Sequence, residues 1–226
     1  MKQFAILSVF DRVDGALQDM KFILGTKKNI TETFEDDGTC HCVTVVVVPD
    51  AYVTQVKTVE SDGYTAIQFG SGLTKENKLS KPLRGHLKDL GMFKYIKEIR
   101  LDGKESAIFK RGDRIDVSLF KVGDLVDIRA ISKGKGFQGV VKRHGFSGGS
   151  RTHGQKHSER EPGAIGGGGR AGGRVRKGLR MAGRMGGETV SVRNLKVVDV
   201  DEKNHEISII GAIPGNRGSL VEIRAK

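Results

Sequence analysis

The 226-residue sequence contains no tryptophan, only four prolines and two cysteines, and no long apolar run. The two cysteines, Cys40 and Cys42, are too few for a scaffold held by disulfides, and no second pair completes a zinc site. They flank His41 in an apolar stretch, so we expect buried strand residues in a reducing compartment. Because no run approaches the roughly 18 apolar residues that span a bilayer, we expect no membrane partner.

The first residues superficially resemble the start of a signal peptide, because Met1-Lys2-Gln3 precedes an apolar run. That run stops after seven residues at Asp11-Arg12, and no small-residue cleavage site follows it. We therefore interpret residues 1–21 as an N-terminal extension, a short helix or an added strand, of a cytoplasmic protein.

Acidic residues are outnumbered, since 39 Lys and Arg against 27 Asp and Glu give a net charge of +12 and a pI near 9.8. Such a balance favours a polyanionic partner. Residues 132–187 hold thirteen Lys and Arg, two acids and eighteen of the 32 glycines, a net charge of +11, whereas the rest of the chain carries +1. We therefore divide the chain into a domain of residues 22–131 and 188–226 and an extended basic loop of residues 132–187.

The nearly neutral remainder is patterned as β structure, with short runs of β-branched residues that end at turn residues. The expected strands are Cys40–Val48, Tyr52–Val59, Tyr64–Phe69, Lys94–Leu101, Arg114–Phe120, Leu125–Ile131, Thr189–Val200, Glu206–Ile210 and Ser219–Arg224. One short helix is expected at Pro82–Leu90, with proline in its first turn and Gly91 just beyond its end. Many short strands predict a mainly β fold, either a closed barrel or a sandwich.

The apolar residues of 132–187 follow neither a period of two nor a period of 3.6, so the pattern predicts no regular structure there. Self-repulsion and the conformational entropy of glycine oppose folding of this segment. A polyanion would neutralise the bases, and glycine would let the backbone lie close to it. We infer that the segment is disordered by itself and becomes ordered on nucleic acid.

The candidate nucleic-acid contacts are the cations, three histidines and one phenylalanine of this segment. Arginine suits bidentate phosphate contacts, and histidine bonds phosphates or stacks on bases. The residues are Lys133, Lys135, Phe137, Lys142, Arg143, His144, Arg151, His153, Lys156, His157, Arg160, Arg170, Arg174, Arg176, Lys177, Arg180 and Arg184. Aromatic residues are few, which favours a grip on folded RNA backbone over a single-strand stacking platform.

Two motifs in the same segment suggest other chemistry. Gly134–Gly139 matches GxGxxG, but a dinucleotide site needs a long helix next, and residues 140–146 allow two turns at most. His153 and His157 have i, i+4 spacing without further ligands, so we expect no metal. No catalytic set is found, and we expect no enzyme activity, cofactor or small-molecule substrate.

Several short motifs occur along the chain in an order that is typical of one protein family. They are Leu24–Lys28, Val53–Lys57, Asp62–Gln68, Ser132–Arg143, Thr152–Gly154, Pro162–Gly166, Met181–Gly186 and Gly211–Gly215. Together they closely resemble the bacterial form of the universal large-subunit ribosomal protein three family, from about Phe22 to the C-terminus.

The resemblance implies a closed six-stranded barrel of the kind found in translation factors. It also implies a loop, here residues 132–187, that runs through ribosomal RNA toward the peptidyl transferase region. Binding near the 3′ end of large-subunit RNA, an early role in assembly and contacts with neighbouring large-subunit ribosomal proteins are implied as well. After Gly166, this chain has three further glycines and Arg170 where many members carry glutamine and asparagine.

The leading hypothesis is thus a structural, RNA-binding component of the large ribosomal subunit in the cytoplasm. A general nucleic-acid-packaging protein of the nucleoid type would use the same charge and is the alternative. A nucleotide-dependent enzyme built on the glycine motif is the third hypothesis.

Overall fold

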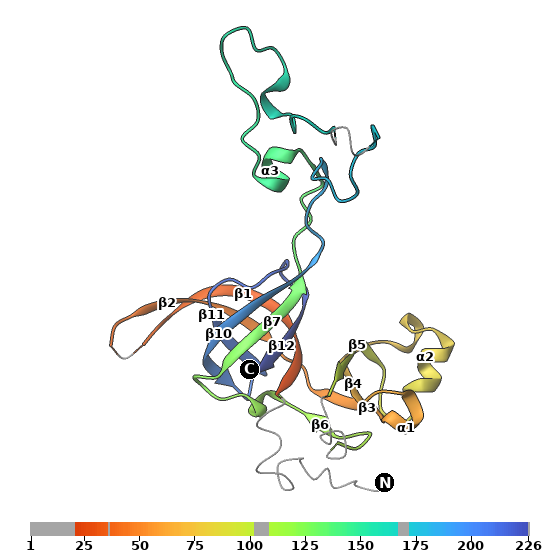
Figure 1. Cartoon of the computed structure of the whole chain (residues 1–226). Helices are drawn as coiled ribbons and strands as arrows, with labels where there is room; N and C mark the ends of the chain where they lie inside the picture. Colours follow the sequence, from red (N-terminus) through yellow and green to blue (C-terminus); the bar gives the residue numbers. More distant parts are fainter. Residues whose placement is uncertain (1–20, 36, 102–108, 167–171, 226) are drawn as a thin grey trace, which may run out of the picture. The chain divides into compact units, whose positions relative to one another are not determined.

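The computed structural model describes residues 21–35, 37–101, 109–166 and 172–225 (Figure 1). The predicted extension 1–21, apart from Lys21, lies outside the described residues, as do the three glycines 167–169 and Arg170. The chain separates into two compact units. One is built from the chain up to Ile131 and from Val190 onward, and the other is Ser132–Thr189.

Six strands of the first unit form a closed barrel in the order β1-β12-β7-β10-β11-β2. Their bounds are β1 Phe22–Phe34, β2 Cys40–Val47, β7 Leu125–Ile131, β10 Thr189–Asp201, β11 Glu206–Ile210 and β12 Leu220–Ala225. In β7, alternate side chains are buried, which is the period of two that places one face of a strand on the core. The prediction of a mainly β chain is confirmed.

The sequence did not predict β1, and it predicted Cys40 and Cys42 to be buried. The second half of β1 is mostly polar and exposed, and a bulge lies between Lys27 and Asn29. Both cysteines are free and exposed on β2. The prediction of their burial was wrong, because β1 and the first half of β2 pair with each other over residues that are largely exposed.

A second antiparallel sheet in the same unit has the order β5-β4-β3-β6. Its strands are β3 Ala51–Lys57, β4 Ala66–Leu73, β5 Phe93–Arg100 and β6 Arg114–Ile115. The sequence predicted all four strands, with somewhat different bounds, but gave no sign that they form a sheet apart from the barrel. One cluster of buried side chains includes Phe22 and Ile223 from the barrel and Ile67 from this sheet, so the two sheets share a core.

Three short α-helices are present among the described residues, α1 Val59–Asp62, α2 Lys81–His86 and α3 Val140–His144, with 3-10 turns at η2 Glu76–Lys78, η4 Val117–Leu119 and η5 Ser158–Arg160. The prediction of a single helix was therefore wrong. The helix expected at Pro82–Leu90 is α2, which ends earlier, with Leu87 as its C-cap. The strand expected over Arg114–Phe120 stops at Ile115, because the Asp116 side chain accepts a hydrogen bond from the Ser118 backbone N–H and begins η4.

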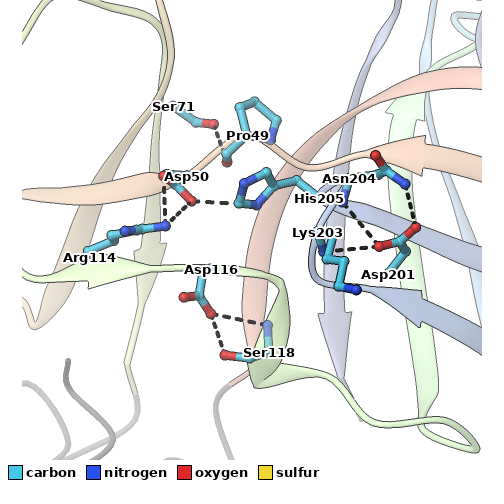
Figure 2. A network of polar contacts seen from close by, with 10 residues as sticks. All are labelled: Pro49, Asp50, Ser71, Arg114, Asp116, Ser118, Asp201, Lys203, Asn204 and His205. Atoms are coloured by element: carbon cyan, nitrogen blue, oxygen red, sulfur yellow. Dashed lines mark hydrogen bonds and ion pairs between the residues drawn. The ribbon is translucent and has the colours of Figure 1, made fainter.

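A polar network joins the second sheet to the turn between β10 and β11 (Figure 2). The carboxylate of Asp50 lies 3.0 Å from Nη2 of Arg114 and 3.8 Å from Nδ1 of His205. The carbonyl of His205 accepts a hydrogen bond from the Val48 backbone N–H at 2.7 Å. Within the turn, Asp201 accepts from the backbone N–H groups of Lys203 and Asn204 at 3.0 Å. The link between the two sheets is therefore polar as well as apolar.

Candidate nucleic-acid interface

The second unit contains the basic segment, and we call residues 132–187 the basic arm. Its two ends are joined by backbone hydrogen bonds, from Ser132 N to Glu188 O at 2.8 Å, from Lys135 N to Met185 O at 2.9 Å and from Met185 N to Gly136 O at 2.9 Å. The short strands β8 Phe137–Gln138 and β9 Gly183–Arg184 continue this pairing. The sequence predicted no regular structure here, and the paired base shows that this prediction was incomplete. The base is held by backbone hydrogen bonds, which leave no periodic pattern of apolar residues in the sequence.

Helix α3 packs on this base. Val140 is buried, Nη1 of Arg143 donates to the carbonyl of Met181 at 2.8 Å, and Nε2 of His144 lies 3.0 Å from the same oxygen. The ring of His144 also contacts Phe146, with 5.9 Å between centroids. Arg143 and His144, both predicted to contact nucleic acid, are thus half-buried and have partners within the arm.

Glycine is required at two close approaches in the arm. A Cβ on Gly186, which has φ +72°, would overlap the carbonyl oxygen of Lys133. A Cβ on Gly148, at φ +77°, would overlap the carbonyl oxygen of Glu159. Side chains at either position would force these backbone segments apart. Sequence analysis assigned the glycines of the arm to contacts with nucleic acid, but these two also hold the arm itself together.

Beyond α3 the chain forms a loop closed on itself. The backbone N–H of Gly149 donates to the carbonyl of Glu159 at 3.1 Å, and Nε of Arg151 lies 2.6 Å from the carboxylate of Glu159. A cavity of about 480 Å³ lies inside this loop, lined by glycine backbone, two serines, Phe146, Glu161 and Pro162. The arm therefore presents a hollow with polar and apolar walls as well as an array of cations.

Most of the predicted contact residues are exposed in the structure. These are Lys133, Lys135, Phe137, Lys142, Arg151, His153, Lys156, His157, Arg160, Arg174, Arg176, Lys177, Arg180 and Arg184, while Arg170 lies outside the described residues. Phe137 exposes 75% of its surface, which makes its ring available for stacking. The histidines 153 and 157 lie in turn and irregular backbone rather than on a helix.

Few of the positive charges of the arm are neutralised by carboxylates in the part of the chain that the structure describes. Of its twelve described Lys and Arg residues, Arg151 is the one that forms an ion pair with a described carboxylate. Such cations, left to solvent beside glycine-rich backbone, can contact phosphate oxygens with both charge and hydrogen bonds. The arrangement therefore suits a grip on a nucleic-acid backbone.

The structure gives little support to other chemistry in the arm. Gly134–Gly139 passes through β8 and leads into α3, which has 5 residues, too short for the helix that carries a dinucleotide phosphate. In the described part of the chain, no group of three or more His, Cys, Asp or Glu side chains is placed to hold a metal ion. No helix among those residues is long and apolar enough to cross a membrane.

Comparison with known proteins agrees with the geometry. The sequence profile of a family described as ribosomal protein L3 matches residues 100–211. The large ribosomal subunit protein uL3 of Herpetosiphon aurantiacus is 43% identical over 202 residues, which cover 89% of this chain and 94% of the relative. The proteins of the same name from Thioalkalivibrio sulfidiphilus and Carboxydothermus hydrogenoformans are 45% and 44% identical, covering 89% and 90% of this chain and 95% and 96% of those relatives.

Proposed function

From the premise that the chain belongs to the ribosomal protein L3 family, we propose that it is a structural, non-catalytic component of the large ribosomal subunit. Its location is then the ribosome of the cytoplasm, and its partners are large-subunit ribosomal RNA and neighbouring ribosomal proteins. The observation that carries the RNA-binding role is the basic arm, whose described Lys and Arg side chains have one carboxylate partner among them.

The mechanism of binding follows from the charges and backbone of the arm. Exposed guanidinium and ammonium groups replace the counterions of the phosphate backbone, and the release of those ions supplies a large part of the binding free energy. The arm beyond its paired base is rich in glycine, which has the most conformational freedom to lose, and contacts with RNA fix its conformation. Family resemblance supports a path for the arm toward the peptidyl transferase region.

The first unit has a different role in this proposal. Its barrel, of the type found in translation factors, binds near the 3′ end of large-subunit RNA and helps to nucleate assembly of the subunit. The resemblance to the family supports these assignments. The boundaries at residues 22–131, 132–187 and 188–226 describe a barrel domain that carries the arm as an insertion.

The proposal is tested by sedimentation of a cell extract on a sucrose gradient, followed by detection of the protein. The protein should migrate with the large ribosomal subunit, and treatment with DNase should leave its position unchanged. Migration with chromosomal DNA that DNase abolishes would instead identify a packaging protein. Crosslinking followed by sequencing of the attached RNA then identifies the contacted nucleotides, which should be ribosomal.

A further inference from the structure

A second cationic site lies in the first unit, apart from the arm. A cleft of about 340 Å³ is bordered by residues of four neighbouring barrel strands, β1, β12, β7 and β10, and of β5 in the second sheet. Four of these strands each contribute one arginine to its wall. They are Arg100 on β5, Arg129 on β7, Arg193 on β10 and Arg224 on β12.

The four arginines are exposed residues, and no ion pair joins any of them to a carboxylate among the described residues. One of the four has a defined packing partner, since Cζ of Arg100 lies 4.8 Å from the centre of the Tyr64 ring. Four arginines outnumber the three carboxylates that line the same cleft, and two of those carboxylates pair with lysines. The remaining positive charge favours an anion between the arginines.

The acidic residues of the cleft are bonded to other groups. Glu98 lies 2.7 Å from Nζ of Lys57 and accepts a hydrogen bond from the Tyr64 hydroxyl at 2.6 Å. Glu222 lies 3.0 Å from Nζ of Lys97. Asp127 accepts a hydrogen bond from the backbone N–H of Asn194 at 3.0 Å.

Cross-strand register alone suggests a different pairing. Arg129 lies opposite Glu222 and Arg224 lies opposite Asp127 in the β7–β12 ladder, where opposite charges commonly interact. In the structure these carboxylates contact Lys97 and the Asn194 backbone instead. The net charge along the sequence gave no sign of this site, because four arginines and three acids line it and their charges nearly cancel. In the structure the acids bond to other groups, which leaves the arginines without ion pairs to the described carboxylates.

We infer that this arginine cleft is the place where the first unit, outside the basic arm, binds phosphate groups of RNA. The inference rests on the proposed function, because it takes ribosomal RNA as the partner. Arginine presents a planar fork that bonds two oxygens of one phosphate. Four strands of two sheets that share a core place four such forks around one hollow.

The test uses the full chain, a transcript of the 3′ region of large-subunit ribosomal RNA, and binding measured across a range of salt concentrations. In the double variant Arg129→Gln/Arg224→Gln, the slope of log affinity against log salt should become shallower by about 1.4–1.8, at roughly 0.7–0.9 for each lost contact. The matched control, Lys121→Gln/Lys203→Gln, removes the same charge at exposed positions away from the cleft and should leave the slope within about 0.3 of the unmodified protein's.

A second variant keeps the test informative if the first folds poorly. Arg129→Lys/Arg224→Lys retains the charge but loses the bidentate fork, so it should keep the salt slope and bind several-fold more weakly. If the cleft variants have the same slopes and affinities as the control Lys121→Gln/Lys203→Gln, the inference is overturned and the proposed function is unaffected. Absence of binding by the unmodified chain would contradict the proposed function itself.

Discussion

The barrel and the base of the basic arm are ordered by different interactions. In the barrel, alternating side chains such as Val126, Ile128 and Ala130 are removed from water on one face of β7, and apolar burial stabilises the strand pairing. In the arm, Val140 is the one apolar side chain that is buried among the described residues. Its base relies on backbone hydrogen bonds and on glycines that permit close approach. The arm can therefore present its cations to a partner, whereas the barrel keeps its shape without one.

Removal of charge from the arm is expected to give the largest effect. The variant Arg174→Gln/Arg176→Gln/Lys177→Gln/Arg180→Gln removes four exposed cations. Each phosphate contact contributes about 0.7–0.9 to the slope of log affinity against log salt. Loss of four contacts should therefore lower the affinity for ribosomal RNA on the order of a thousandfold at about 0.1 M salt. Titration of a fluorescent RNA transcript measures this loss, and the midpoint of urea unfolding should stay unchanged.

The matched control for this variant removes four exposed lysines from the first unit, at Lys75, Lys78, Lys81 and Lys88. We expect its loss of affinity to be much smaller. Equal losses in the two variants would mean that RNA binding depends on surface charge in general and does not distinguish the arm from the first unit.

Addition of a single methyl group at the base of the arm, by a glycine-to-alanine substitution, should have the next largest effect, on the stability of this base. Gly186→Ala places a Cβ against the Lys133 carbonyl in a left-handed backbone conformation, which costs about 1–3 kcal/mol locally. Hydrogen exchange of the Lys135 and Met185 amides should accelerate, because their bonds close the base. Gly134→Ala is the control, since its Cβ would meet no atom within 4 Å. Unchanged exchange in Gly186→Ala would show that backbone fit is not what orders this base.

A smaller effect is expected from acid on the ion pair of the second sheet. Burial raises the pKa of Glu98, but hydrogen bonds from Lys57 and Tyr64 outweigh it and hold the pKa below its ordinary value of 4.5. The ionised form therefore stabilises the folded state above that value, and this contribution is lost as the pH falls through the lowered pKa. Because the pair is partly exposed, it contributes less than about 1 kcal/mol.

This pH effect is measured as the free energy of unfolding in urea between about pH 6 and pH 3. Glu98→Gln should lose the part of the acid dependence that this carboxylate supplies, and Glu60→Gln, a change at an exposed residue of α1, should retain it. If both variants follow the unmodified protein, the pair does not contribute to stability.

Removal of the whole arm is expected to have the smallest effect on the stability of the barrel. Deletion of residues 132–187 with a short bridge should leave the first unit folded, because Ser132 N and Glu188 O already lie 2.8 Å apart. Circular dichroism and thermal unfolding measure the outcome. Loss of cooperative unfolding would mean that the arm belongs to the folding unit of the barrel.

The sequence predicts the fold where local pattern and burial agree. The middle of Leu125–Ile131 alternates apolar and polar residues, and the segment forms β7 with the expected bounds. The strand β1 was missed because its second half, which includes Lys28 and Asn29, pairs with β2 without being buried. The separation of β3–β6 from the barrel was also missed, since which strands pair depends on contacts far apart in the chain.

The candidate site shows the same limit. The sequence identified the cations of the arm, because charge and glycine content are properties of composition. It could not separate Arg143 and His144, which bond the Met181 carbonyl, from exposed neighbours such as Lys142. It also gave no sign of the arginine cleft, because Arg100 and Arg224 come from different sheets and line one cleft only after folding. The prediction that the arm is disordered without nucleic acid stays a prediction.

The arm enters and leaves the barrel through β7 and β10, which are neighbours in the closed sheet. For a flexible connection between fixed ends, the entropic cost grows only with the logarithm of its length, at about 0.6 kcal/mol for each doubling. Evolution can therefore lengthen or shorten the reach of this connection, and change what its far end touches, at almost no cost to the domain that anchors it.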